Sequence, residues 1–179
     1  MKSGLMQRRK GPDRIWRRKE GGSKMDDLER MAGILERLSS ETGRRFDAGE
    51  FWARFRIQKA VYFLKVMGHP GLARYRYDLY LRGPYSPDLT KAYYAIEAWG
   101  PGERARVTPA AISPAALSVL KDAIAEGEWF METVVTLHSI ASSEHTTKGE
   151  TFEIARRLKP AREPYFERAW AFLCDRGLL

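Results

Sequence analysis

The chain has 179 residues, of which 44% are hydrophobic and 12% aromatic, so it can bury a core of its own and is expected to form one domain. Its formal net charge is +8, but residues 1–24 carry nine basic and two acidic side chains and so hold seven of those charges. The rest of the chain is nearly neutral. We therefore predict a single α-rich domain over residues 25–179, preceded by a basic tail.

A lone cysteine and the absence of long apolar runs indicate where the protein works. Cys174 excludes an intrachain disulfide, which is typical of proteins from reducing compartments. No apolar run approaches the roughly 20 residues that span a bilayer. The N-terminus has no apolar stretch of signal-peptide length. We expect a cytoplasmic protein with no membrane partner.

The basic tail, residues 1–24, contains Gly and Pro, shows little apolar periodicity and is predicted to be disordered. Because Lys and Arg displace counterions from phosphates, it can serve as a nucleic-acid-binding arm. The alternatives are a solubilising tail and an upstream extension of a chain that naturally starts at Met25. The candidate nucleic-acid contacts are Arg8, Arg9, Lys10, Arg17, Arg18 and Lys19.

The folded part opens with a predicted helix over residues 26–42, whose apolar side chains recur on one face. Gly43 is a suitable stop for it. Asp47 and Glu50 then have the spacing of a capping box, with Asp in place of the usual Ser or Thr. They predict the start of a second helix of about 20 residues within the range 48–68.

This second helix is predicted to be apolar on two sides. One stripe contains Ala53 and Ile57, and the other contains Phe51, Phe55 and Tyr62. A helix with apolar faces on different sides is usually buried between neighbours. We therefore expect it at the centre of the fold.

Residues 75–82 alternate in the pattern of a strand with one buried face. Gly83–Ser86 is then expected to turn the chain into a helix over 87–98, with Ser86 as its N-cap and Pro87 at its first position. Gly83 is expected to adopt a backbone conformation that other residues adopt poorly. The side chains predicted to point inward are Tyr75, Tyr77, Leu79 and Leu81, and those predicted to point outward are Arg76, Asp78, Tyr80 and Arg82.

The rest of the chain is predicted to be helical, apart from a short second strand near residues 104–108. Ser113 and Pro114 repeat the cap-plus-proline signal. The helices predicted there span about 114–126, 128–141, 150–158 and 163–176. The fold class is therefore mainly α with a small β-sheet (α+β), a helical domain with a short antiparallel hairpin. A winged-helix-like arrangement is one form that such a domain can take.

Motifs for the common catalytic chemistries are absent from the sequence. Neither GxGxxG nor GxxxxGK[ST] occurs, and the segment RGPYSPD around Ser86 lacks the G-x-S-x-G pattern of a nucleophile elbow. The three histidines are in no HExxH motif and beside no second cysteine, so no zinc site is expected. We predict a protein that is not an enzyme and needs no metal or cofactor.

The outward face of the predicted strand is the best candidate for contact with a partner. Arg76, Tyr80 and Arg82 share that face, and Tyr85 lies at the junction with the next helix. Arginine and tyrosine there suit a protein partner, and they can also contact an RNA or DNA backbone. The plainer alternative is a strand with one wet face.

Three stretches resemble a bacterial and archaeal family. RIQKAVYFLKVMG at 56–68 is similar to a helix of the SocA/Panacea-type antitoxin-like proteins and of the YwgA-like proteins. YDLYLRGPYSPDL at 77–89 is similar to their aromatic strand, G-P-Y-S turn and following helix, and IARRLKPAREPYFERAWAFLCDRGLL at 154–179 to the YwgA-like ending. The motif positions that match are Gln58, Lys59, Tyr62, Gly83, Pro84, Tyr85 and Ser86, with Ile57 in the usual Leu position.

The resemblance covers roughly residues 50–179 and implies a mainly helical domain with a small sheet. Its better-known members bind proteins, as toxin neutralisers or proteolytic adaptors. It therefore implies a non-enzymatic protein-interaction module, antitoxin- or adaptor-like, whose partner would be a toxin or a protease component. The alternative is a nucleic-acid-binding regulator that uses the basic tail and a winged-helix-like face.

Overall fold

The computed structural model describes residues 24–179, and the structural statements below concern these residues. The first helix begins at Lys24. The predicted disorder of the basic tail, and its six candidate nucleic-acid contacts, lie outside the described residues.

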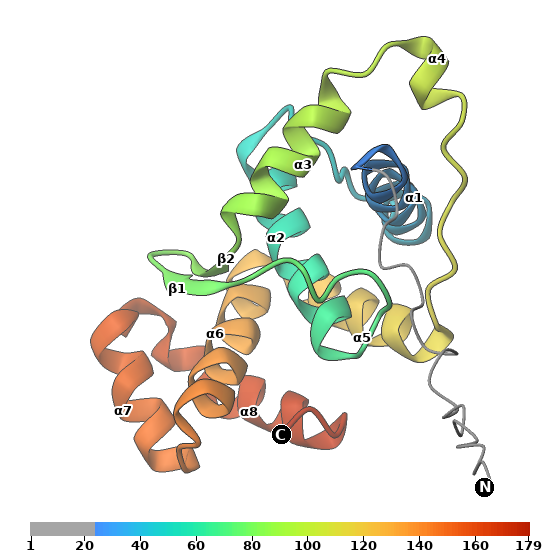
Figure 1. Ribbon diagram of the computed structural model, residues 1–179. Helices are drawn as coiled ribbons and strands as arrows, with labels where there is room; N and C mark the ends of the chain where they lie inside the picture. The colour runs from blue at the N-terminus through green and yellow to red at the C-terminus, as the bar shows by residue number, and fades with distance from the viewer. Residues whose placement is uncertain (1–23) are drawn as a thin grey trace, which may run out of the picture.

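Residues 24–179 form a mainly helical domain with one small antiparallel sheet, as the sequence predicts (Figure 1). The helices are α1 (Lys24–Thr42), α2 (Phe51–Val66), α3 (Pro87–Glu97), α4 (Pro101–Arg104), α5 (Pro114–Ala125), α6 (Glu128–Glu144), α7 (Lys148–Leu158), the 3-10 helix η1 (Pro160–Tyr165) and α8 (Phe166–Asp175). The strands β1 (Asp78–Tyr80) and β2 (Gly83–Tyr85) pair with Leu79 opposite Pro84.

The α2 and α6 helices lie side by side at the centre of the domain. Every residue of α2 from Phe55 to Leu64 is buried, and so is every residue of α6 from Phe130 to His138. On one side α1 packs against α3 and α5, and on the other α7 and α8 pack against α6. The prediction of a central, sandwiched second helix is confirmed.

The start signals of two helices act as predicted. The Ser86 hydroxyl accepts a hydrogen bond from the Leu89 N–H at the start of α3, and the Ser113 hydroxyl accepts one from the Ala116 N–H at the start of α5. A proline occupies the first position of each helix, where a missing N–H leaves no bond unmade.

The predicted capping box at the start of α2 is wrong. Asp47 accepts a hydrogen bond from the Gly49 N–H at 2.9 Å and pairs with Arg45 at 2.7 Å. Its carboxylate thus binds groups of the loop before α2 and does not cap the helix. Glu50 occupies the N-cap position without a side-chain capping bond, and α2 has 16 residues. Phe51, assigned to the core by the helical pattern, is 46% exposed at this end.

The predicted strand over 75–82 is also wrong in detail. The chain turns at Leu81 and Arg82, so Gly83–Tyr85 is the returning strand of a hairpin and not the turn. Tyr75 is buried before β1 begins, whereas Leu79 and Leu81, predicted to point inward, are 38% and 84% exposed. The alternation of apolar and polar residues over 75–82 continues through the turn. It therefore cannot show that a two-residue turn interrupts the strand.

Two boundaries in the second half also differ. No strand forms at 104–108 among the described residues; instead Pro101, next to Gly100, starts the short helix α4, as a proline at a first helical position favours. The predicted helix over 163–176 begins later as an α-helix, because Pro164 lies in the 3-10 helix η1 and α8 starts at Phe166.

We predict that Ser86→Ala lowers the free energy of unfolding by about 1–2 kcal/mol, and Ser113→Ala by about 0.5 kcal/mol. Ser86 is fully buried, so no water can replace its hydroxyl as acceptor for the Leu89 N–H, whereas Ser113 is exposed. Urea unfolding of both variants measures the difference. Equal losses would contradict the role assigned to burial.

Candidate functional site

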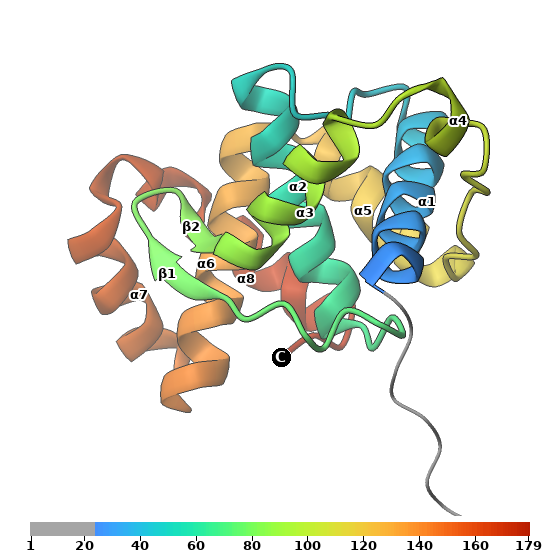
Figure 2. The same cartoon turned by 45° about the horizontal axis from the view of Figure 1, so that its top comes forward.

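The hairpin β1–β2 lies between α3 and α7 and rests against α2 and α6 (Figure 2). Two polar side chains of α2 hold the backbone of the hairpin. The Lys59 ammonium donates to the Pro84 carbonyl at 2.8 Å. The Gln58 amide donates to the Ser86 carbonyl at 3.0 Å and accepts from the Ser86 N–H at 2.9 Å. Buried polar groups on the helix and on β2 thus satisfy one another.

Gly83 lets β2 approach α6 closely. Its φ is +80°, and a Cβ added there would lie 2.8 Å from the Thr136 hydroxyl and 3.4 Å from the Lys59 ammonium nitrogen. Both the backbone conformation and the space therefore require glycine, as the sequence predicts.

A buried ion network holds the turn of the hairpin. The Glu132 carboxylate, 1% exposed on α6, accepts from Lys159 at 2.6 Å and from Arg162 at 2.9 Å. Lys159 also donates to the carbonyl of Leu81 in the turn. One carboxylate thus ties α6, η1 and the hairpin together. Because its two cations are largely buried, water could not solvate them well if the carboxylate were removed.

Aromatic and arginine side chains cover this network. The guanidinium of Arg162 lies 3.7 Å from the ring centre of Trp129, and that of Arg82 lies 5.4 Å from the same ring. Trp129 also meets Trp52 edge to face, with ring centres 5.1 Å apart. Cations over aromatic faces are attracted by the ring quadrupole. The hairpin turn is therefore packed on an aromatic layer made of Trp52 and Trp129.

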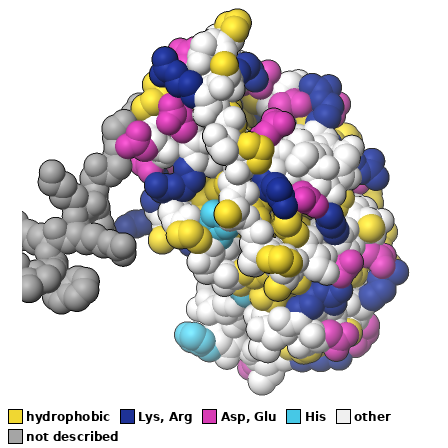
Figure 3. Space-filling model, turned by 90° about the vertical axis from the view of Figure 1, so that its right-hand side faces the viewer, with side chains coloured by type: hydrophobic (Ala, Val, Ile, Leu, Met, Phe, Trp, Pro, Cys, Tyr) yellow, Lys and Arg dark blue, Asp and Glu magenta, His cyan; other side chains and the backbone are white. Residues whose placement is uncertain are grey.

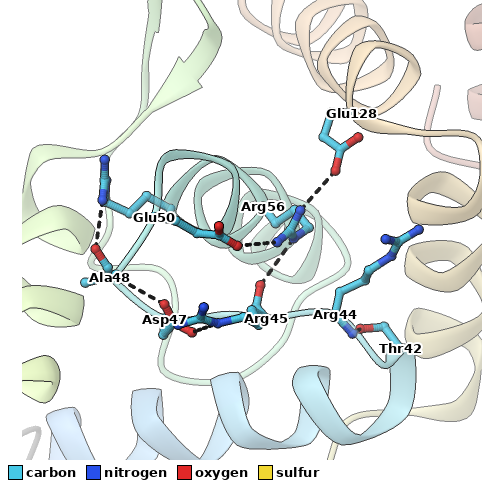
Figure 4. Close-up of polar contacts among 10 residues, drawn as sticks. Thr42, Arg44, Arg45, Asp47, Ala48, Glu50, Arg56 and Glu128 are labelled. Carbon is cyan, nitrogen blue, oxygen red and sulfur yellow. Dashed lines mark hydrogen bonds and ion pairs between the residues drawn. The ribbon is translucent and has the colours of Figure 1, made fainter.

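Arg56 joins the ends of the two central helices (Figure 4). Its guanidinium lies 3.0 Å from Glu128, 3.8 Å from Glu50 and 3.2 Å from the carbonyl of Arg45. Figure 4 shows it between the loop before α2 and the start of α6. Trp52 and Trp129 lie next to these anchored helix ends. The contacts of Arg56 therefore fix the positions of the two tryptophans relative to each other.

A pocket of about 270 Å³ lies beside the hairpin. Five aromatic rings line it, together with three cationic side chains, Arg54, Lys59 and Arg82, and no acidic one. The aromatic lining residues are Phe51, Phe55, Tyr85, Tyr93 and Tyr94.

A larger hollow of about 520 Å³ lies between α1, α3 and the chain around α4, and Tyr93 of α3 lines both hollows. Its lining mixes Glu36 and Glu97 with Arg44, Arg45 and Arg104. Basic and acidic side chains are likewise interspersed over the right-hand side of the molecule, which Figure 3 shows. The pocket beside the hairpin therefore differs from this hollow in carrying a single sign of charge.

The structure brings together three of the four predicted partner-binding residues. Tyr80 packs edge to face on Tyr85 with ring centres 5.3 Å apart, and Arg82 and Tyr85 line the same pocket. Arg76 is exposed, two residues before β1, and does not line that pocket. Whether these residues bind a partner stays a prediction.

The positions carried by the family resemblance also converge. Gln58 and Lys59 contact Ser86 and Pro84, and Gly83 packs against Thr136 beside Lys59. Tyr62 lies one turn farther along α2, where its hydroxyl is 2.8 Å from Nδ1 of His138. Two stretches quoted for the resemblance are thus in direct contact, at a junction that holds the hairpin.

Burial shifts the proton equilibria of this central region. It lowers the pKa of Lys59 from 10.5 to about 7, an effect that the charge of Glu132 opposes and that of Lys159 adds to. It also lowers the pKa of His138 and raises the pKa of Tyr62 to about 12. The ammonium of Lys59 therefore holds its proton far less firmly than an exposed lysine.

Sequence reasoning missed Glu132, Lys159, Arg162, Trp129 and Trp52. A single acidic residue inside the apolar run WFMETVV of α6 is the signal that could have revealed Glu132, because a buried carboxylate requires cationic partners. The partners lie 27 and 30 residues later, and no spacing rule connects them.

Within residues 24–179, no three His, Cys, Asp or Glu side chains converge in a way that could hold a metal ion. None of the helices described is long and apolar enough to cross a membrane. No protein-family model matches the chain, and neither a curated protein nor a solved structure gives a significant match. The resemblance to the SocA/Panacea-type and YwgA-like proteins accordingly stays a prediction.

We predict that Glu132→Gln lowers the free energy of unfolding by about 3–5 kcal/mol, because Lys159 and Arg162 would be left without a counter-charge in a buried site. The control is Glu167→Gln, which removes an exposed partner of Lys148 and should cost less than about 1 kcal/mol. Chemical denaturation tests both variants, and a small loss for Glu132→Gln would contradict a structural role for the network.

We predict that Lys59 makes the folded protein more stable as the pH rises from 7 towards 9.5. Its pKa is about 7 in the folded chain and near 10.5 when unfolded, so the unfolded chain binds more protons in this window. The slope reaches at most about 1.4 kcal/mol per pH unit. Comparing the pH dependence of unfolding for the wild type and Lys59→Met should show a smaller slope in the variant, and identical slopes would refute the assignment.

Proposed function

We propose that this protein is a non-enzymatic protein-interaction module, antitoxin- or adaptor-like, whose binding surface is built around the hairpin. One observation carries the proposal. Of the large hydrophobic side chains that are exposed among residues 24–179, most lie on the hairpin or on the helix ends beside it. We call this group the hairpin surface: Phe51, Trp52, Leu79, Tyr80, Leu81 and Tyr94, together with Arg82.

The composition of the hairpin surface supports a protein partner. Exposed apolar side chains scattered singly are ordinary, but a contiguous group marks an interaction site. The contacts of Trp52 with Phe51, and of Phe51 with Arg82, join the helix end to the turn. Tryptophan, tyrosine and arginine are the residues that most often dominate the binding energy of protein interfaces.

The surface is also rigidly supported, which favours binding. Lys59, Lys159 and Gln58 hold the hairpin backbone, and Arg56 holds the ends of α2 and α6. A preorganised surface loses less conformational freedom when a partner binds. Toxins and protease components are the partner classes that the family resemblance implies.

The alternative, a nucleic-acid-binding regulator, depends on the basic tail. Beyond residue 24 the chain is nearly neutral, and its acidic and basic groups are paired in many surface ion pairs. Affinity for a nucleic-acid backbone requires a concentration of basic groups, which the tail carries. The experiment below therefore includes nuclease.

We predict that affinity-tagged protein captures a protein partner from native lysate, and that Tyr80→Ser combined with Leu81→Ser reduces the yield at least about tenfold, as loss of an interface hot spot does. Both side chains are exposed, so the variant should keep the thermal stability of the wild type. The control is Leu179→Ser, which removes an exposed apolar side chain at the C-terminus.

Nuclease treatment separates the two functions. Capture that survives nuclease and Leu179→Ser, but is lost with the hairpin variant, supports the proposal. Capture that disappears with nuclease favours the regulator. A captured set that the hairpin variant leaves unchanged would contradict the assignment of the surface.

A further inference from the structure

The pocket beside the hairpin has an unusual combination of lining groups. Its walls are aromatic, and its three charged side chains, Arg54, Lys59 and Arg82, are all cations. Within residues 24–179 none of the three forms an ion pair with a carboxylate. By contrast, Arg56, Lys159 and Arg162, which lie nearby and are largely buried, each have an acidic partner.

Lys59 is the member of this trio that most needs an anion. It is 2% exposed, and among the residues that the structure describes its ammonium nitrogen has a single hydrogen-bond acceptor, the Pro84 carbonyl, although an ammonium carries three donors. The face of Phe55 lies 5.2 Å from that nitrogen. A charged amine in such surroundings is stabilised when a carboxylate comes near it.

We propose that this pocket binds a carboxylate carried next to an aromatic or aliphatic side chain, presented by an acidic peptide segment of the protein partner. The proposal rests on the proposed function for its source of peptide, and on charge complementarity for the chemistry. Lys59, Arg82 and Arg54 would receive the carboxylate. The rings of Phe51, Tyr85 and Tyr94 would pack on the apolar side chain.

The size of the pocket agrees with this occupant. At about 270 Å³ it falls below the roughly 300–1,000 Å³ of pockets that enclose drug-sized ligands. It suits a single side chain and its carboxylate. A peptide anchored there would continue over the exposed residues of the hairpin surface, which Arg82 and Tyr85 join to the pocket.

Proton uptake should accompany binding. A carboxylate near Lys59 raises the pKa of that amine from about 7, so binding is strongest below pH 7 and weakens as the pH rises through that value. The charged and titratable groups around Lys59 are Glu132 on α6, Lys159 after α7, Arg82 and Tyr85 on the hairpin, Arg54 on α2, and Tyr93 and Tyr94 on α3.

The test uses the full chain and three small probes in a ¹H–¹⁵N NMR titration. Acetyl-phenylalanine presents a terminal carboxylate, acetyl-Phe-Asp-amide presents a side-chain carboxylate, and acetyl-phenylalaninamide is the neutral control. We expect at least one charged probe to bind at least about tenfold more tightly than the neutral one, as a hydrogen bond to a charged group implies. The tighter of the two charged probes shows whether a chain end or an internal acidic residue is preferred.

Matched variants locate the site. Arg82→Gln should weaken binding of the charged probe at least about tenfold, whereas Arg106→Gln, at an exposed arginine after α4, should leave it unchanged. Equal affinity for charged and neutral probes, or equal effects of the two variants, would overturn the proposal. If charged probes fail while the hairpin surface still captures a protein, the pocket inference is wrong and the proposed function stands. If the charged probes bind while capture fails, the pocket inference stands and the proposed function is wrong.

Discussion

The buried carboxylate of Glu132 is the interaction on which the rest of this structure depends. It forms ion pairs with both Lys159 and Arg162, and Lys159 in turn donates to the turn of the hairpin. A single acid in the buried part of α6 therefore helps to hold the turn of the hairpin, some 50 residues earlier in the chain. Because breaking a buried ion pair leaves an uncompensated charge, displacing the hairpin turn from this network is costly.

A second constraint works from the opposite side of the hairpin. Gln58 and Lys59 belong to a helix that is buried all round, where polar side chains are costly unless their bonds are satisfied. The buried carbonyls of Pro84 in β2 and of Ser86 after it accept hydrogen bonds from both side chains. The hairpin backbone is thus the hydrogen-bond partner of polar side chains in the core. The outer residues of the hairpin are exposed and can contact other molecules.

Local signals in the sequence carried much of this fold. The caps at Ser86 and Ser113, the central position of α2 and the glycine conformation at residue 83 follow from short-range rules, and all are confirmed. The hairpin turn, the buried network and the aromatic layer could not be found in this way. The network and the aromatic layer depend on contacts between residues far apart in the chain. The turn is local, but alternation over 75–82 hid it because period-2 patterns do not mark where a strand reverses.

The long separation of these contacts has a consequence for synthesis. Leu81 and its donor Lys159 stand 78 residues apart, so the hairpin emerges from a ribosome well before the residues that hold it. During that interval the hairpin is carried by a nascent chain that lacks Glu132 and Lys159. The turn of the hairpin therefore gains this hydrogen bond only after the chain has been synthesised as far as Lys159.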